Sequence, residues 1–411
     1  MKKILFTIIV FSTLFSNYIG SWLVIGSIPS GAIVRDGSIF LFICLAIMNK
    51  SFFKFNKKEL KIFSIYLLLL FSVSISFLNA NSFLQGIMGS RVYILYTLLL
   101  LVLIKSKFIT INNDFVIMNI LIAFLVADLI ALIDFFSLGQ FSYFLGYIPG
   151  NLYNNLVLIT SFEDKIRLNG GFADALNFGY FLALSVALTL NLIIQKVNHR
   201  LLTLSVLVLS TISVLFTLTR GAIFVTFLLY IFFIIYKFYK KPSRILLLSI
   251  FSFLMAIFIF FIFNYELLET LASRFTNSDA SSKGSTSGRF LMAENSINYL
   301  LENPQGMGLG TQGTAYLISD IDNRLNTDNY FFWTALEIGL SGLILHTTLY
   351  FLIFKYYIEN IYKLEFIKLS LFTIFIVSAL ISSSFISALV LIFYMIILLL
   401  PRRLNENCNR L

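Results

Sequence analysis

Charge is scarce in this sequence: Asp, Glu, Lys and Arg together make up 12% of its 411 residues. Soluble domains carry about 25% charged residues, so a soluble multidomain protein is excluded. Cysteine and histidine number two each. Because Cys44 lies in an apolar run and Cys408 in the C-terminal tail, a disulfide is excluded. His199 and His346 are also far apart in the chain, and we expect no metal site.

Apolar residues take the place of charge, since 59% of the chain is hydrophobic and 17% aromatic. They form runs long enough to cross a bilayer core of about 30 Å. The sequence therefore predicts an all-α polytopic membrane protein with a single integral membrane domain over residues 1–411. About twelve spans are expected, near 4–24, 32–48, 62–78, 88–104, 115–136, 172–194, 201–217, 221–236, 245–264, 329–353, 366–380 and 385–400. The first lacks a small-residue cleavage site, and we interpret it as a retained anchor.

The net charge of +10 would suit a nucleic-acid partner only if the basic residues shared one surface. Instead the lysines cluster in alternate connections between the apolar runs, such as 50–61, 105–107, 237–241 and 355–368. The positive-inside rule places these connections, and both termini, in the cytoplasm. We therefore interpret the charge as a topology signal, helped by anionic membrane lipid, and expect no nucleic-acid partner.

Two connections on the predicted outer side are long, at 137–171 and 265–328, and such lengths mark either function or disorder. In the second, an apolar stripe from Phe290 to Leu301 predicts an amphipathic helix that begins after Ser287 and stops before Pro304. It would lie on the membrane or on the helix bundle. The GLGTQG stretch at 308–313 matches a dinucleotide fingerprint, but no strand precedes it. We expect a turn-rich segment, with a phosphate-binding nest of backbone amides as the alternative.

Arginine dominates the basic residues of the predicted outer side, where topology requires no positive charge. These arginines are Arg35, Arg91, Arg167, Arg220, Arg274, Arg289 and Arg324. A planar guanidinium can bind two phosphate oxygens at once, which lysine cannot. The alternative is pairing with the outer acids, namely Asp36, Asp128, Asp134, Asp174 and Glu337, and we expect it for Arg35 beside Asp36. For Arg91, Arg167, Arg220 and Arg289 we predict binding of a membrane-borne polyanion, such as a lipid-linked pyrophosphate.

Four stretches carry a family resemblance. Arg167 leads into GGFADALNFGYF, and Thr219-Arg220-Gly221-Ala222 stands at the mouth of a span. Arg289 opens the predicted helix before Asn303-Pro304 and the following glycines. Asn329 precedes Gly339 and Gly342 at a fixed spacing. With these stretches, between about 160 and 345, the sequence resembles the bacterial O-antigen polymerase and O-antigen ligase superfamily. It departs from the ligases at Asp328, where they carry histidine, and in the Ala175-Leu176 insertion before Asn177.

The resemblance implies a GT-C-like membrane glycosyltransferase that needs no metal or cofactor and works at the outer face of the bacterial plasma membrane. Its donor would be a glycan on undecaprenyl pyrophosphate. Because the ligase histidine is absent, we favour a polymerase of O-antigen or capsular polysaccharide, whose acceptor is another lipid-linked repeat unit. The alternatives are an O-antigen ligase and, in a different class, a flippase or transporter, which would concentrate polar groups near the midplane. The resemblance also allows a chain-length regulator and a flippase as partners.

The candidate site follows from this chemistry. Arg220 and Arg289 would stabilise the departing pyrophosphate, and Asp328 would accept the proton of the attacking hydroxyl. The expected substrate-binding residues are Arg167, Arg91, Asp174, Asn177, Asn329 and Glu337. The alternative for Asp328 is a helix start, with Thr327 as N-cap and the acid in the first turn. Asp174 and Glu337 would then be the remaining candidates for the base.

Overall fold

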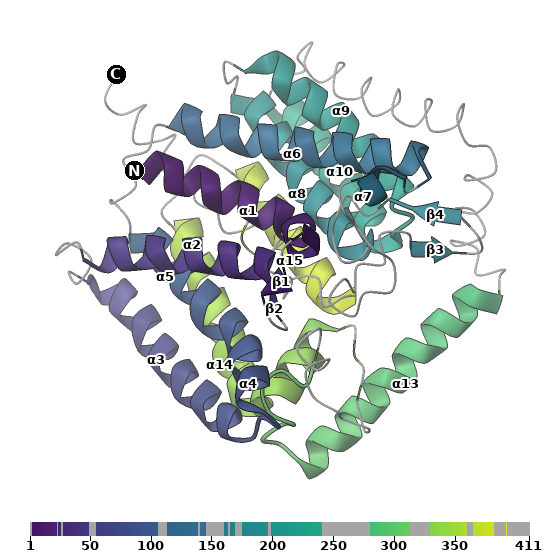
Figure 1. The fold of residues 1–411 in the computed structure, drawn as a ribbon. Helices are drawn as coiled ribbons and strands as arrows, with labels where there is room; N and C mark the ends of the chain where they lie inside the picture. The colour runs from purple at the N-terminus through teal and green to yellow at the C-terminus, as the bar shows by residue number, and fades with distance from the viewer. Residues whose placement is uncertain are drawn as a thin grey trace.

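The computed structural model describes residues 2–22, 24–25, 28–48, 55–105, 113–138, 140–144, 160–162, 165–168, 175–195, 199–240, 280–312, 325, 327, 329–359, 365–381 and 392. Its helices are α1 Lys2–Trp22, α2 Ser30–Ile47, α3 Lys57–Leu78, α4 Phe83–Arg91, the π-helical turn η2 Val92–Tyr96, α5 Thr97–Lys105, α6 Asn113–Phe136, α7 Gln140–Phe144, α8 Ala175–Gln195, α9 Arg200–Phe216, α10 Arg220–Lys240, α13 Ala280–Glu302, α14 Tyr330–Glu359 and α15 Glu365–Ile381 (Figure 1). Two short antiparallel pairs join β1 Val24–Ile25 to β2 Ile28–Pro29 and β3 Thr160–Phe162 to β4 Lys165–Arg167.

The expectation of a helical membrane protein is confirmed. Among the described residues, six helices are long and apolar enough to cross a membrane, and each coincides with a predicted span. They are Lys57–Leu78, Phe83–Leu103, Asp114–Phe136, Ala175–Gln195, Arg220–Lys237 and Tyr330–Tyr356. Helices α1, α2, α9 and α15 also lie where spans were predicted. The predicted spans near 245–264 and 385–400 lie outside the described residues, apart from Ile392, so the total of twelve stays a prediction.

Helix α8 lies at the centre of one group of helices, against α9, α10 and α15 (Figure 1). Nearly all its side chains are buried, which its continuous apolar sequence allows. Small residues let α8 and α10 approach closely, because a Cβ added to Gly179 would lie only 2.8 Å from the Cβ of Ala222. This close contact sets the position of the start of α10, where Arg220 lies.

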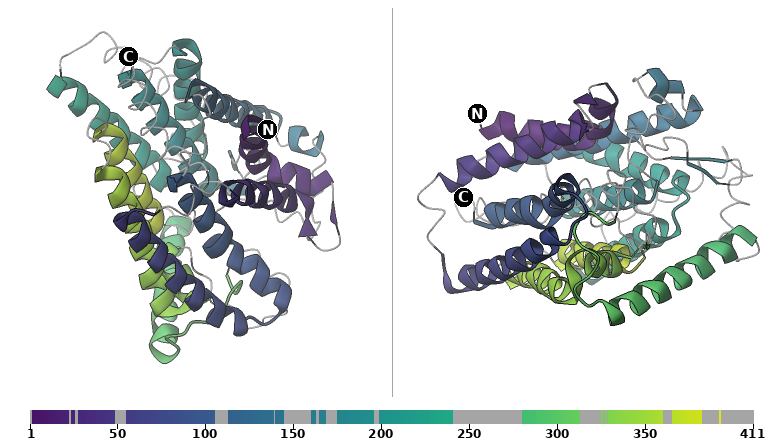
Figure 2. Two further views of the ribbon diagram at one scale, coloured as in Figure 1. Left: turned by 90° about the vertical axis from the view of Figure 1, so that its left-hand side faces the viewer. Right: turned by 60° about the horizontal axis from the view of Figure 1, so that its bottom comes forward.

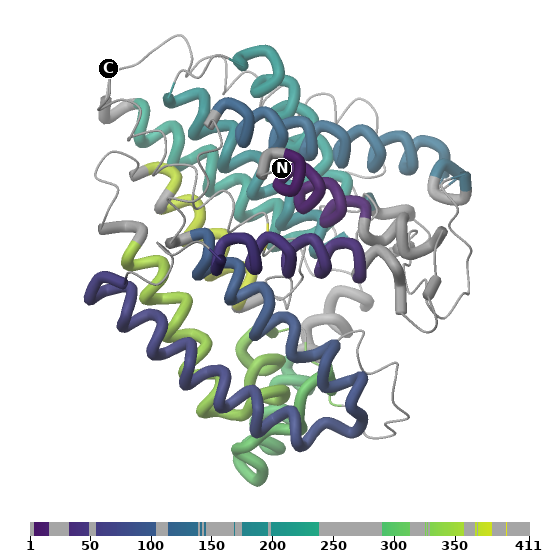
Figure 3. The backbone as a smooth tube through the Cα atoms, turned by 60° about the vertical axis from the view of Figure 1, so that its left-hand side comes forward, coloured from purple at the N-terminus to yellow at the C-terminus, as the bar shows by residue number. Residues whose placement is uncertain are grey.

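Helix α14 packs along α3 in a second group (Figure 3). Beside them α4, η2 and α5 form one continuous helix with a π-helical turn in its middle. A π-turn displaces the backbone bonding pattern, and side chains take up the carbonyls. Here Tyr66 Oη donates to the Ile94 carbonyl at 3.2 Å, and Thr97 Oγ1 to that of Val92 at 3.4 Å. The turn carries the buried side chains of Tyr93 and Tyr96.

Helix α13 extends along the edge of the molecule with its C-terminal end near α14 (Figure 2). It ends at Glu302, before Pro304 as predicted, but it begins at Ala280 and the predicted start at Ser287 is wrong. The earlier turns are built from small and polar residues and so lack the apolar periodicity on which the prediction relied. Of the predicted stripe, Leu300 packs on Ala335 and Leu336 of α14, while Phe290, Ile297 and Leu301 are exposed.

Candidate functional site

One end of the α8–α9–α10 group brings together three segments that the sequence singled out. The amide of Leu168, directly after Arg167, donates to the carbonyl of Phe216 at the end of α9, at 3.1 Å. Thr219 Oγ1 donates to the carbonyl of Ala175, the first residue of α8, at 3.2 Å. Strand β4, the start of α8 and the turn before Arg220 therefore meet. We call this meeting point the Arg220 corner.

The turn before Arg220 is tight. Thr217 and Thr219 flank Leu218, whose φ of +53° is unusual for a residue with a side chain. Thr217 Oγ1 accepts from the Thr219 amide at 3.3 Å, which holds the reversal between α9 and α10. Arg220 is the first residue of α10 and is half-buried, and Asn177 lies half-buried in the first turn of α8. Arg167 ends β4, while Asp174 lies outside the described residues.

A second site lies where the segment 303–312 meets α14. Gly339 interrupts α14 with φ 74° and ψ 173°. In an unbroken helix the Leu340 amide would bond to the Leu336 carbonyl. Here the Leu340 amide donates to the carbonyl of Pro304 at 2.9 Å, and the Leu336 carbonyl accepts from the amide of Met307 at 2.6 Å. The segment thus replaces the broken helical bond with two of its own, and we call it the docked segment.

The docked segment requires glycine. Gly306 has a φ of +80°, and a Cβ there would lie 2.7 Å from the Leu336 carbonyl oxygen. On its other side the segment touches α3 and α4, because the Leu309 amide donates to the Ser76 carbonyl at 3.2 Å and Gln85 Nε2 to that of Gly310 at 2.9 Å. In the dinucleotide-like stretch, a Cβ at Gly308 or Gly310 would lie 2.5 Å from the carbonyl oxygen of Asn79 or Gln85, so these two glycines allow close backbone approach to α3 and α4.

The carboxylate of Glu337 closes this contact. Glu337 is 3% exposed, and its Oε2 accepts from the Tyr93 hydroxyl at 2.7 Å. Its Oε1 accepts from the amides of Gly310 at 3.2 Å and Gln312 at 3.4 Å. The backbone nest considered as a phosphate site is thus filled by a carboxylate of the same chain, and that alternative is wrong for these amides. Substrate binding by Glu337 stays a prediction, and its contacts favour an anchoring role.

The start of α14 differs from the expectation. The predicted N-cap was Thr327, but Asn329 Oδ1 accepts from the amides of Phe331 at 2.8 Å and Phe332 at 3.4 Å. Asn329 is therefore the cap, and Thr327 Oγ1 supports it by accepting from its amide at 3.3 Å. Asp328 lies outside the described residues, and its role as base stays a prediction. Arg289 lies inside α13, so the prediction that it opens this helix is wrong; its role in binding pyrophosphate stays a prediction.

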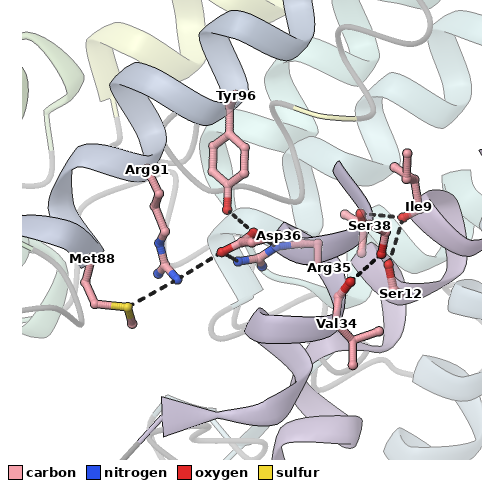
Figure 4. A network of polar contacts seen from close by, with 10 residues as sticks. Ile9, Ser12, Val34, Arg35, Asp36, Ser38, Met88, Arg91 and Tyr96 are labelled. Carbon is pink, nitrogen blue, oxygen red and sulfur yellow. Dashed lines mark hydrogen bonds and ion pairs between the residues drawn. The ribbon is translucent and has the colours of Figure 1, made fainter. Parts of the chain in front are cut away.

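A third polar cluster joins α2 to the α4–η2 helix (Figure 4). Asp36 pairs with Arg35, as predicted, with Nε to Oδ1 at 2.8 Å. Tyr96 Oη also donates to Asp36 Oδ1, at 2.9 Å, and Arg91 Nη1 lies 3.5 Å from Oδ2. The sequence did not indicate Tyr93 and Tyr96 as polar partners, since both stand in an apolar run. Their positions two and five residues after Arg91 were the available signal.

Asp128, expected among the possible arginine partners, has a different environment. It is fully buried on α6, and its Oδ2 accepts from Ser210 Oγ of α9 at 2.6 Å. Ser185 Oγ of α8 lies 2.8 Å from Ser210 Oγ, so the two hydroxyls are hydrogen-bonded. Asp128 and the two serine hydroxyls therefore link helices α6, α8 and α9.

The buried bundle, the Arg220 corner and the docked segment together describe a multi-pass membrane protein with polar sites at the ends of its helices. Residues 205–347 match a family model described as O-antigen ligase, a range that includes Arg220, the docked segment and Glu337. An O-antigen polymerase of Salmonella muenchen is 36% identical over 93% of this chain and 99% of its own length. The chain belongs to the O-antigen polymerase and ligase superfamily, which confirms the resemblance.

Proposed function

We propose that the protein is an O-antigen or capsular polysaccharide polymerase of the bacterial inner membrane. It would transfer a growing glycan from undecaprenyl pyrophosphate to a lipid-linked repeat unit on the outer face. The similarity to a polymerase over nearly the whole chain supports this function. The structural observation that carries it is the Arg220 corner, where the backbone after Arg167, the start of α8 and the turn before Arg220 are bonded together.

The proposed reaction needs only groups of this chain. The acceptor hydroxyl oxygen attacks the anomeric carbon of the donor sugar, and the bond from that carbon to the pyrophosphate oxygen breaks. The pyrophosphate leaves with the electron pair, and its charge is stabilised by Arg220 and Arg289, with Arg167 binding the same anion. The hydroxyl proton passes to Asp328. Asp174, Asn177 and Asn329 hold the sugars.

The orientation of the helices supports a site on the outer face. Helix α10 runs from Arg220 to a lysine-rich end with Lys237 and Lys240, and α14 runs from Tyr330 towards Lys355. Helix α3 begins with Lys57 and Lys58 and ends beside the docked segment. The lysines of these three helices thus stand at the ends away from the two sites. By the positive-inside rule those ends are cytoplasmic, and the candidate sites are external.

Deletion of the gene, followed by gel analysis of the surface glycan, tests the function. A polymerase predicts caps of single repeat units on the cell surface. The second candidate is a ligase, favoured by the description of the matching family model. It predicts loss of all attached glycan, and a flippase predicts accumulation of repeat units inside the cell.

A further inference from the structure

Helices α2 and α4 carry an arginine pair that lies apart from the Arg220 corner (Figures 1 and 4). Arg35 and Arg91 share the single carboxylate of Asp36. Arg35 holds it closely, with Nε to Oδ1 at 2.8 Å, and Tyr96 Oη donates to the same oxygen at 2.9 Å. Arg91 reaches the other oxygen only at 3.5 Å. The cluster therefore contains one carboxylate, Asp36, and two guanidinium groups. Because Arg35 is the closer partner of Asp36, the charge of Arg91 is the less well neutralised of the two.

Most hydrogen-bond donors of Arg91 have no acceptor within the part of the chain that the structure describes. A guanidinium offers five N–H donors. Among the described residues, the acceptors of Arg91 are Asp36 and the sulfur of Met88, at 3.9 Å, and both face Nη1. Its side chain is 23% exposed, whereas that of Arg35 is 7% exposed. Arg91 can therefore bind an incoming anion while Asp36 keeps its bonds to Arg35 and Tyr96.

The surroundings of Arg91 are apolar. Ile87 lies one turn before Arg91 on the same face of α4, and Ile94 follows in the π-helical turn; they are 43% and 36% exposed. On α2, Val34 and Leu41 are exposed as well. In a membrane-spanning helix such exposed apolar side chains face lipid, so Arg91 lies beside the bilayer. An anion carried on a lipid can reach it there from within the membrane.

We propose that Arg91, backed by Arg35 and restrained by Asp36, binds the pyrophosphate of the acceptor lipid. This inference rests on the proposed polymerase function, in which two lipid-linked pyrophosphates must be held at once. The donor pyrophosphate leaves at the Arg220 corner. The acceptor pyrophosphate stays bonded to its sugar, so its site needs only to bind and orient it. A planar fork that takes two phosphate oxygens serves that purpose.

Purified full-length protein in liposomes can separate the two sites. The donor is a polyprenyl-pyrophosphate repeat unit with its acceptor hydroxyl blocked. One acceptor carries the same repeat on an uncleavable C-glycosyl phosphonate analogue of the lipid pyrophosphate, and the other carries it on an uncharged alkyl chain. We expect Arg91→Gln to raise KM for the charged acceptor roughly 10- to 100-fold, the usual effect of losing hydrogen bonds to a charged group. The variant should leave kcat unchanged with either acceptor, and it should leave KM for the uncharged acceptor unchanged.

Three further measurements test whether Arg91 binds the acceptor pyrophosphate. Ser90→Ala, next to Arg91 and bonded only to the Ile87 carbonyl of its own helix among the described residues, is the matched control and should behave as wild type. If Arg91→Gln does not insert, Arg91→Lys decides, since lysine keeps the charge but loses the fork and should raise the same KM. Inorganic pyrophosphate should compete poorly with the charged acceptor, and equal competition would identify a site for a free anion and overturn the lipid assignment.

Failure of the acceptor site and failure of the polymerase function give different results. An equal effect of Arg91→Gln on both acceptors, or no effect on either, overturns the acceptor site and leaves the polymerase intact. If wild-type protein joins neither donor–acceptor pair, the polymerase function itself fails.

Discussion

The Tyr93 hydroxyl donates a 2.7 Å hydrogen bond to the Glu337 carboxylate, although 244 residues separate them in the chain. Tyr93 belongs to the π-turn after α4, and Glu337 lies two residues before the break in α14 at Gly339. Because the other carboxylate oxygen receives two amides of the docked segment, a single buried acid joins three parts of the structure. Since the docked segment directly follows α13, the acid also anchors the chain at the end of that helix.

Glu337 can be an anchor or a proton acceptor, and two substitutions distinguish these roles. Glutamine keeps the shape, since its oxygen can accept from the amides and its NH₂ can donate to Tyr93 Oη. We expect Glu337→Gln to retain most polymer, measured as glycan chain length on gels. Glu337→Ala leaves buried donors unsatisfied, at about 1–3 kcal/mol each, and should lower the unfolding temperature as well as polymer. A stable Gln variant without polymer would instead identify Glu337 as the base.

Gly89 tests the docked segment from the side of α4. A Cβ at this position would collide with the backbone of Gly310. We expect Gly89→Ala to displace the segment, to destabilise the protein by about 1–3 kcal/mol and to reduce polymer. Gly37→Ala is the control, since its added Cβ meets nothing within 4 Å. Equal unfolding temperatures for the two variants would contradict the close contact of α4 with the segment.

Arg220 tests the corner itself. If its guanidinium binds the departing pyrophosphate through two oxygens, Arg220→Lys should reduce the rate of polymer formation about 10²-fold. The protein should still insert at normal abundance, which an immunoblot of membranes would show. Full chain length in the lysine variant would mean that a point charge is sufficient there.

Asp328 can now be tested without disturbing the helix start, because Asn329 supplies the cap. We expect Asp328→Asn to reduce polymer formation by roughly 10²–10⁴-fold, the usual contribution of a positioned base, with unchanged expression. Asn329→Ala removes both the cap, at about 0.5–2 kcal/mol of stability, and the proposed contact with the sugar, so it should lower the unfolding temperature as well as polymer. Near-normal polymer in Asp328→Asn would leave Asp174 and Glu337 as the candidates for the base.

The membrane spans could be predicted because apolar length alone decides them. The pairing of Arg35 with Asp36 was also predictable, since the two are neighbours in the chain. The docked segment could not be predicted, because its hydrogen bonds join residues that are far apart in the sequence. The break in α14 at Gly339 has no local sequence signal beyond the glycine itself. Tyr93 was missed for a related reason: in an apolar run a tyrosine facing a buried acid cannot be distinguished from one facing lipid.

The most direct test of the account is polymer formation by the purified protein in liposomes, supplied only with undecaprenyl-pyrophosphate-linked repeat units. The account predicts a ladder of lipid-linked products, with one undecaprenyl pyrophosphate released for every linkage formed and no requirement for added metal. Repeat units that stay single under these conditions, but are transferred when a lipopolysaccharide core acceptor is added, would contradict it and identify a ligase.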